Sequence, residues 1–169
     1  MAIERQSAEA ILSRLTLAIN ELNAASSEDE ALDVLRRCAV DLTEAQGVAV
    51  VMRDGDLCHY LADDSDSELW PDERFPMESC ISGWAMLKGE PAVVSNIFQD
   101  ARIPHYLYAP TFVRSLIITP MGDGKPFAAL GVYWDHVREH SAAEVELLRT
   151  LADCAASAFG RIGVARLGA

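Results

Sequence analysis

Two tight-turn signals, each between β-prone residues, constrain the fold of this chain more than any other feature. Asp54-Gly55 separates GVAVVMR from LCHYLAD, and the GDGK segment at 122–125 separates FVRSLIITPM from PFAALGVYWD. Such turns join neighbouring antiparallel strands, because glycine adopts the positive φ angles that short hairpin loops require. The sequence therefore predicts two hairpins within a largely antiparallel sheet.

Helical patterns lie at both ends of the chain. Apolar side chains recur at helical spacing within residues 1–24 and predict one long amphipathic helix. They are Ile11, Leu15, Ile19 and Leu22. Ser27 with Glu30 fits a capping box at the start of a second helix, which we expect to end near residue 47. Ser141 with Glu144 repeats that signal and predicts a C-terminal helix over 141–165.

The region between the two hairpins alternates polar and apolar blocks. Residues 63–72 are rich in Asp and Ser, so we expect a solvated surface loop. The segment ISGWAMLK, closed by Gly89, predicts a short helix that leads into a strand at 92–95. This order of elements predicts an α+β fold, with helices on one face of the sheet and loops that roof a pocket on the other.

Length and composition favour one domain over residues 1–169 and restrict its environment. The longest uncharged apolar stretches are far below the roughly 20 residues of a membrane span. Glu4 and Glu9 stand where a signal peptide would carry basic and apolar residues, so we expect a cytoplasmic location. The formal net charge of −12 repels phosphates and anionic lipids, so we expect neither a nucleic-acid partner nor a membrane partner.

The four cysteines do not form a recognisable motif. Cys38, Cys58, Cys80 and Cys154 are widely spaced and contain no CxxC pair. Zinc ligands usually come in such pairs, and disulfides are uncommon in reducing compartments. We therefore expect buried thiols, no metal site and no cofactor.

Three segments resemble a known family in order and in spacing: SCISGWAMLKGEPAVVSNI, QDARIPHYLYAPTFVRSLIITPM and KPFAALGVYW. They are similar to GAF domains of bacterial sensor histidine kinases. The block from Phe75 to Trp134 carries this resemblance, which extends over nearly the whole chain when the flanking helices are included. The resemblance implies a sheet of about six strands with a pocket under its loops.

The same resemblance implies a sensory function in two-component-type signalling, without catalysis. A small molecule or a redox state would be sensed, and the terminal helices 1–24 and 141–165 would form a homodimer and pass the signal to a kinase or other output domain. Two alternatives stay open. In the first, the chain would be a thiol redox switch built on Cys80. In the second, it would be a dimerisation module whose pocket is filled by its own side chains.

Two specialised GAF activities fit these residues poorly. Bilin-binding relatives attach their chromophore to a Cys-His pair, but the pair here, Cys58-His59, lies in a predicted strand of the first hairpin, far from the family's position. Reductases of free methionine sulfoxide carry a cysteine directly before the glycine that matches Gly83, where this chain has Ser82. Their second cysteine falls in the loop that here reads ARIPHYLY.

Nucleotide and haem binding also lack support in the sequence. We find no match to the Asn-Lys-Phe-Asp-Glu signature of cyclic-nucleotide-binding GAF domains, and we interpret Asp100 with Arg102 as a loop ion pair. A haem site would need an axial ligand, such as a histidine. The four histidines, which we interpret as surface or hydrogen-bonding residues, are His59, His105, His136 and His140.

The predicted ligand site combines aromatic side chains with one arginine. Its members are Tyr60, Trp84, Phe98, Tyr106, Tyr108, Phe112, Arg114 and Trp134. Arg114 shares a strand face with Leu116 and Ile118, and a cation among apolar residues requires an anion. That anion is a ligand carboxylate or an internal acid such as Asp100. The aromatic lining favours a small, uncoloured ligand with an apolar or aromatic body and at most one acidic group.

Overall fold

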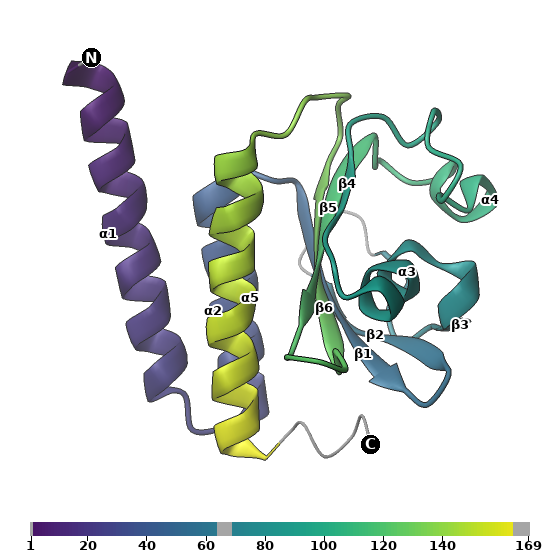
Figure 1. Cartoon of the computed structure of the whole chain (residues 1–169), viewed down its shortest axis with the longest axis horizontal. Coiled ribbons are helices and arrows are strands. Elements are labelled where there is room, and N and C mark those ends of the chain that lie inside the picture. The colour runs from purple at the N-terminus through teal and green to yellow at the C-terminus, as the bar shows by residue number, and fades with distance from the viewer. Residues whose placement is uncertain (1, 64–68, 164–169) are drawn as a thin grey trace.

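A six-stranded sheet forms the centre of the molecule, as the computed structural model shows (Figure 1). The structure describes residues 2–63 and 69–163, with side chains for 7–61 and 69–163. The strands are β1 (Gly47–Asp54), β2 (Leu57–Asp63), β3 (Arg74–Pro76), β4 (Ala92–Val94), β5 (Ser115–Met121) and β6 (Ala128–Trp134). Their order is β3-β2-β1-β6-β5-β4, and all neighbours are antiparallel.

Both predicted hairpins are confirmed. Gly55 turns β1 into β2 with φ 62°, and Gly122 and Gly124 turn β5 into β6 with φ 101° and 70°. These angles belong to the left-handed region, which glycine enters without steric cost. The short strand β3 was not predicted individually, and it extends the sheet by pairing Phe75 with Cys58 of β2.

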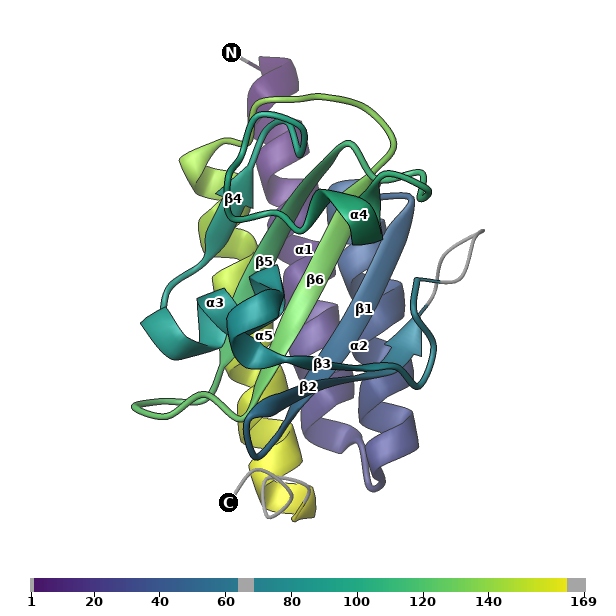
Figure 2. The ribbon, with the colours of Figure 1, turned by 90° about the vertical axis from the view of Figure 1, so that its right-hand side faces the viewer.

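Helices cover one face of the sheet in two layers (Figure 1). The helices are α1 (Ala2–Ala24), α2 (Glu28–Thr43) and α5 (Ala142–Ile162). The side chains of Ser27 and Ser141 accept hydrogen bonds from the backbone N–H groups three residues on, at 3.3 and 3.1 Å, so both predicted caps are confirmed. Helices α2 and α5 lie against the sheet, whereas α1 lies outside them and its first turns project beyond its neighbours (Figures 1 and 2).

Short helices and loops cover the other face, which we call the loop side (Figure 2). They include the 3-10 turn η1 (Met77–Ser79), α3 (Ile81–Lys88) and α4 (His105–Tyr108). Two buried clusters result, one between the sheet and the helices and one between the sheet and these loops. The predicted α+β GAF-like architecture is therefore confirmed.

The predicted surface loop at 63–72 differs in part from the structure. Residues 64–68 lie outside the described part of the chain. Leu69 is buried and Trp70 is half-buried, and both pack into the loop-side cluster. The acidic composition of the segment concealed these two large apolar side chains, and the full burial of Leu69 contributes about 1.5–3 kcal/mol. No helix among the described residues is long and apolar enough to cross a membrane.

Candidate ligand site on the loop side of the sheet

Two of the predicted lining residues lie in a packed aromatic cluster. Tyr60 on β2 contacts Trp70 and Phe75 edge-on, with ring centroids 5.4 and 5.7 Å apart. Tyr108 on α4 contacts the other side of Trp70 at 4.8 Å. Tyr60 and Tyr108 are both almost completely buried. Their rings therefore bind strand, loop and α4 together, and protein atoms surround them.

A polar contact lies inside this cluster. The hydroxyl groups of Tyr60 and Ser82 are 3.2 Å apart, which links β2 to the first turn of α3. Burial raises the pKa of both the Tyr60 and Tyr108 phenols, because a phenolate would lose its hydration there. Both phenols are therefore neutral.

Arg114 carries the charge of the candidate site. Its guanidinium lies 5.5 Å from the ring of Phe98 and donates hydrogen bonds to the carbonyls of Thr111 and Val113, at 2.9 and 2.7 Å. No ion pair joins it to a carboxylate among the residues that the structure describes. The cation is thus held in place by neutral acceptors and one aromatic face.

The predicted alternative partner of Arg114 is engaged elsewhere. The Asp100 carboxylate accepts two hydrogen bonds from the Arg102 side chain, the shorter at 2.6 Å, and one from its backbone N–H. The side-chain interaction lowers the pKa of the Asp100 carboxyl group. The proposed Asp100–Arg114 pair does not form, because the Asp100 carboxylate pairs with Arg102 while the Arg114 guanidinium donates to backbone carbonyls. The predicted loop ion pair between Asp100 and Arg102 is confirmed.

Trp84 lies beside that ion pair. The guanidinium of Arg102 stacks over the Trp84 ring at 4.5 Å and also donates to the carbonyl of Val93 at 3.3 Å. One arginine therefore fastens the loop after β4 to α3. Trp84 is half-buried beneath it.

The remaining predicted residues of the loop side differ in exposure. Phe98 is 49% exposed and Tyr106, on α4, is 74% exposed. Phe112 is half-buried against the loop-side cluster. The ring of His105 lies 6.3 Å from that of Phe98. The accessible part of the candidate site is therefore its outer edge, where Phe98, Tyr106 and Arg114 leave surface for a ligand.

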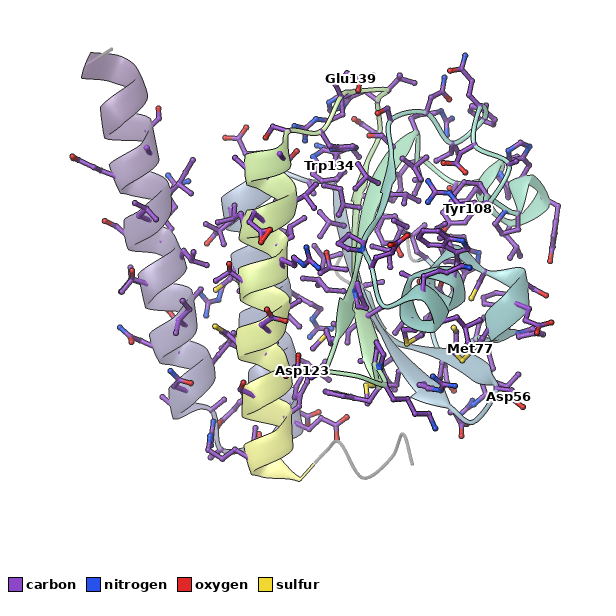
Figure 3. All side chains as sticks on the ribbon, in the orientation of Figure 1. Asp56, Met77, Tyr108, Asp123, Trp134 and Glu139 are labelled. Atoms are coloured by element: carbon purple, nitrogen blue, oxygen red, sulfur yellow. The ribbon has the colours of Figure 1, made fainter. Side chains whose placement is uncertain are left out.

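Trp134 does not belong to this site, which corrects the prediction from sequence. It is the last residue of β6 and points toward the helices, whereas Tyr108 lies on the other side of the sheet (Figure 3). Trp134 shares its face with Val132, and the intervening Tyr133 faces the loop side. Strand alternation predicts that Tyr133 and Trp134 lie on opposite faces of the sheet, but it does not predict which of them faces the helices.

Sequence reasoning also missed three members of the loop-side cluster: Trp70, Phe75 and Ser82. Trp70 was assigned to a solvated loop because of its acidic neighbours. Phe75 belongs to a three-residue strand that is too short for a period-2 pattern to reveal. The sequence singled out Ser82 only because it occupies the position of a cysteine in the related reductases.

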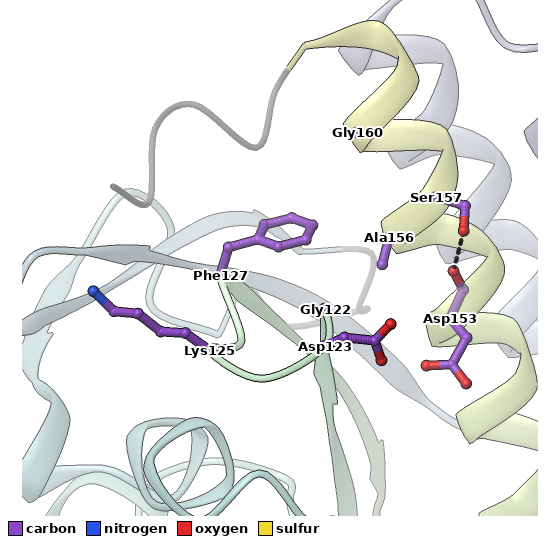
Figure 4. A pocket seen from close by; sticks show the side chains of 8 residues that line it. All are labelled: Gly122, Asp123, Lys125, Phe127, Asp153, Ala156, Ser157 and Gly160. Atoms are coloured by element: carbon purple, nitrogen blue, oxygen red, sulfur yellow. Dashed lines mark hydrogen bonds between the residues drawn. The ribbon is translucent and has the colours of Figure 1, made fainter.

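A cavity of about 440 Å³ lies on the helix side, between α5 and the β5–β6 turn (Figure 4). It is lined by Gly122, Asp123, Lys125, Phe127, Asp153, Ala156, Ser157 and Gly160. The Ser157 hydroxyl donates a hydrogen bond to the backbone carbonyl of Asp153, one helical turn earlier, at 3.1 Å. Asp123, Asp153 and Lys125 give this cavity a mixed charge. The sequence analysis did not predict a cavity here. No cluster of metal-ligating side chains occurs among the described residues.

Comparison with known proteins assigns the architecture to a family. The family model of the GAF domain matches residues 25–159. The chain belongs to the GAF family. That match includes the sheet, the loop side and most of α5, and α1 precedes it. No curated protein matches the sequence significantly.

Solved GAF structures share this fold at low sequence identity. The GAF domain of the Acinetobacter phosphoenolpyruvate-protein phosphotransferase is 16% identical, with a TM-score of 0.79 over 92% of this chain and 96% of that one. The free methionine-R-sulfoxide reductase from Neisseria meningitidis is also 16% identical, with a TM-score of 0.78 over 94% and 93%. The chromophore-binding domain of a bacteriophytochrome from R. palustris is 14% identical, with a TM-score of 0.77 over 94% and 63%. These similarities establish the fold, and the GAF domain family as a whole consists of sensory, small-molecule-binding modules.

Proposed function

We propose that this GAF domain senses a small acidic ligand at the outer edge of its loop side and relays its binding through the terminal helices of a homodimer. The output would be a kinase or another signalling domain of the two-component type in the cytoplasm. The module itself would catalyse nothing. The observation that carries this proposal is Arg114, a cation without an ion-pair partner among the described residues, beside the half-exposed ring of Phe98.

The chemistry at Arg114 favours a carboxylate on an apolar or aromatic body. A guanidinium presents two parallel N–H groups that match a carboxylate, and Phe98 offers aromatic surface beside it. A polyphosphate would require several cations together. Arg102 does not supply a second free cation, because Asp100 neutralises it.

The sheet provides a path from this edge to the helices. Arg114 directly precedes β5, whose Leu116 and Ile118 face the loop side. Ile117, between them, faces the helix-side cluster that contains α5. A ligand that shifts the start of β5 would therefore bias the position of α5, by selecting one of two helix arrangements.

The dimer interface would involve α1. Ile11, Leu12 and Leu17 are exposed, whereas Ala18 and Leu22, further along the helix, are buried within the chain. Exposed apolar side chains clustered on one helix are typical of a protein interface. The proposed signal path therefore ends at α1 and α5, which contact each other.

A second candidate function is a dimerisation module without a ligand. The packed rings of Tyr60, Trp70 and Tyr108 favour it, because they fill the centre of the loop side with the protein's own side chains. The two functions differ in whether any compound binds at the outer edge.

A thermal-shift screen of small carboxylic acids, followed by calorimetry, tests the proposal. An aromatic or acyl acid should raise the melting temperature, and Arg114→Ala should weaken its binding at least about tenfold, as expected for loss of a charge-assisted contact. Arg149→Ala, at a side chain on α5 that is 50% exposed, is the matched control and should leave affinity unchanged. If no acid binds, or if Arg114→Ala binds the acid as the native protein does, the ligand-free module is the better description.

A further inference from the structure

Two cysteines that are 22 positions apart in the sequence meet on the loop side. Cys58 lies on β2, and Cys80 lies between η1 and α3. The pairing of β3 with β2 brings them together, since Phe75 is opposite Cys58 and the Met77 N–H donates to the carbonyl of Asp56 at 2.9 Å. Both side chains are buried in the loop-side cluster, and the Tyr60 hydroxyl, on the same face of β2 as Cys58, lies 3.2 Å from that of Ser82, two residues after Cys80.

The two sulfurs differ in electrostatic environment. Cys80 is the N-cap of α3, and its Sγ accepts a hydrogen bond from the Gly83 N–H at 3.4 Å. The hydrogen bond from Cys58, followed by the backbone donors of Gly83 and Ser82, lowers the pKa of Cys80 against the opposing effect of burial. The same thiol–thiol hydrogen bond, together with burial, raises the pKa of Cys58. Cys80 is therefore the more acidic thiol of the pair, and Cys58 keeps its proton more strongly.

Access to the pair is narrow. Cys80 is 5% exposed and Cys58 is completely buried. A bulky disulfide such as oxidised glutathione cannot approach either sulfur in line, whereas a hydroperoxide needs contact only between one oxygen and one sulfur.

We propose that Cys58 and Cys80 form a redox-active dithiol that a small hydroperoxide oxidises to an intramolecular disulfide. The Cys80 thiolate attacks one peroxide oxygen, which forms an S–O bond, breaks the O–O bond and releases hydroxide. Cys58 sulfur then attacks the Cys80 sulfenic acid, forming the S–S bond. The S–O bond breaks, and its oxygen leaves as water with the Cys58 proton. Two electrons pass from the two sulfurs to the peroxide.

Oxidation would change the start of α3. The disulfide removes the negative sulfur that caps the helix and moves Sγ toward β2, so the Gly83 N–H loses its acceptor. Helix α3 packs on the loop side of β5, and α5 packs on the other side. Oxidation of the dithiol would thus act on β5, the strand that Arg114 directly precedes. This effect does not depend on ligand binding at Arg114.

Peptide mapping of the native protein tests this assignment directly. After treatment with hydrogen peroxide and alkylation under denaturing conditions, we expect the free thiols to fall from four to two per chain and a Cys58–Cys80 linked peptide to appear, with a mass loss of about 2 Da. Oxidised glutathione should produce neither this link nor a mixed disulfide at Cys80. Loss of Cys38 or Cys154 thiols while Cys58 and Cys80 stay free would overturn the proposal.

Two variants separate the roles of the sulfurs. Cys58→Ser should accumulate a sulfenic acid at Cys80 that a cyclic dione traps once denaturant is added, whereas Cys80→Ser should give no trapped product at Cys58. Cys154→Ser, at a half-buried position on α5, is the control and should form the link as the native chain does. Trapping at Cys58 in Cys80→Ser would contradict the assignment. If either variant fails to fold, peptide mapping of the native protein still tests whether Cys58 and Cys80 form a disulfide.

Discussion

Trp134 donates its indole N–H to the backbone carbonyl of Thr43, 3.4 Å away, and so ties the end of β6 to the last residue of α2. The indole ring is 1% exposed. The ring of His140 lies 4.7 Å from it, and the guanidinium of Arg138 covers it at 4.7 Å. This residue is therefore a junction between the sheet, α2 and the segment that leads into α5.

Trp134→Ala should consequently destabilise the fold without affecting the loop side. Removal of a buried tryptophan costs about 3–5 kcal/mol, and an unpaired carbonyl at Thr43 adds to this. Urea unfolding monitored by circular dichroism measures the change. Tyr106→Ala, at a highly exposed ring, is the control and should change the free energy of unfolding by less than about 0.5 kcal/mol. Equal effects of the two substitutions would contradict the placement of Trp134.

His140 gives this junction a pH dependence. Its side chain is completely inaccessible, and burial lowers its pKa from the usual 6.5, although Glu144 opposes this and Arg138 reinforces it. As the pH falls, the unfolded chain therefore binds a proton at His140 before the folded chain does. Stability from neutral His140 is fully present above about pH 6.5 and is lost as pH falls through the lower folded-state pKa.

Denaturant titrations between pH 7.5 and 5 test this expectation. The free energy of unfolding should fall toward acid pH with a slope of up to about 1.4 kcal/mol per pH unit from this group. His140→Gln should flatten the slope, whereas His136→Gln, whose side chain is 57% exposed, should not. An unchanged slope in His140→Gln would show that other groups cause the acid destabilisation.

The sequence predicted the elements with strong local signals and missed those that depend on distant partners. The turns at Gly55 and Gly122 and the caps at Ser27 and Ser141 act within a few residues, so their patterns decide the structure. The face of Trp134 and the proximity of Cys58 and Cys80 depend on which segments meet. Local periodicity contains no information about those contacts.

Two helical glycines should respond to alanine in opposite directions. A Cβ on Gly83 would overlap the backbone carbonyl of Met77, which cannot move without displacing η1. Gly160, within α5, has no atom within 4 Å of such a Cβ. Gly83→Ala should therefore destabilise the protein, while Gly160→Ala should stabilise it by about 0.5–1 kcal/mol, the usual gain of alanine over glycine inside a helix. Thermal unfolding of the two variants measures both signs. Stabilisation by Gly83→Ala would mean that α3 is not packed against η1.

Association through α1 is the remaining prediction. Leu12 is 61% exposed, in the middle of α1. In a two-fold symmetric dimer each such side chain is buried once per subunit, and full burial of a leucine contributes about 1.5–3 kcal/mol. Leu12→Glu should therefore raise the dimer dissociation constant by at least about tenfold.

Light scattering at tens of micromolar distinguishes the outcomes. The native chain should have the mass of a dimer, and Leu12→Glu should shift it toward the monomer. Leu87→Glu replaces a leucine of similar exposure, 52%, on α3 at the opposite side of the molecule, so it should leave the dimer intact. A native chain that is monomeric at these concentrations would remove α1 as a dimer interface. Dissociation by Leu87→Glu instead of Leu12→Glu would place the interface on the loop side, where it would compete with a ligand for the surface around Arg114.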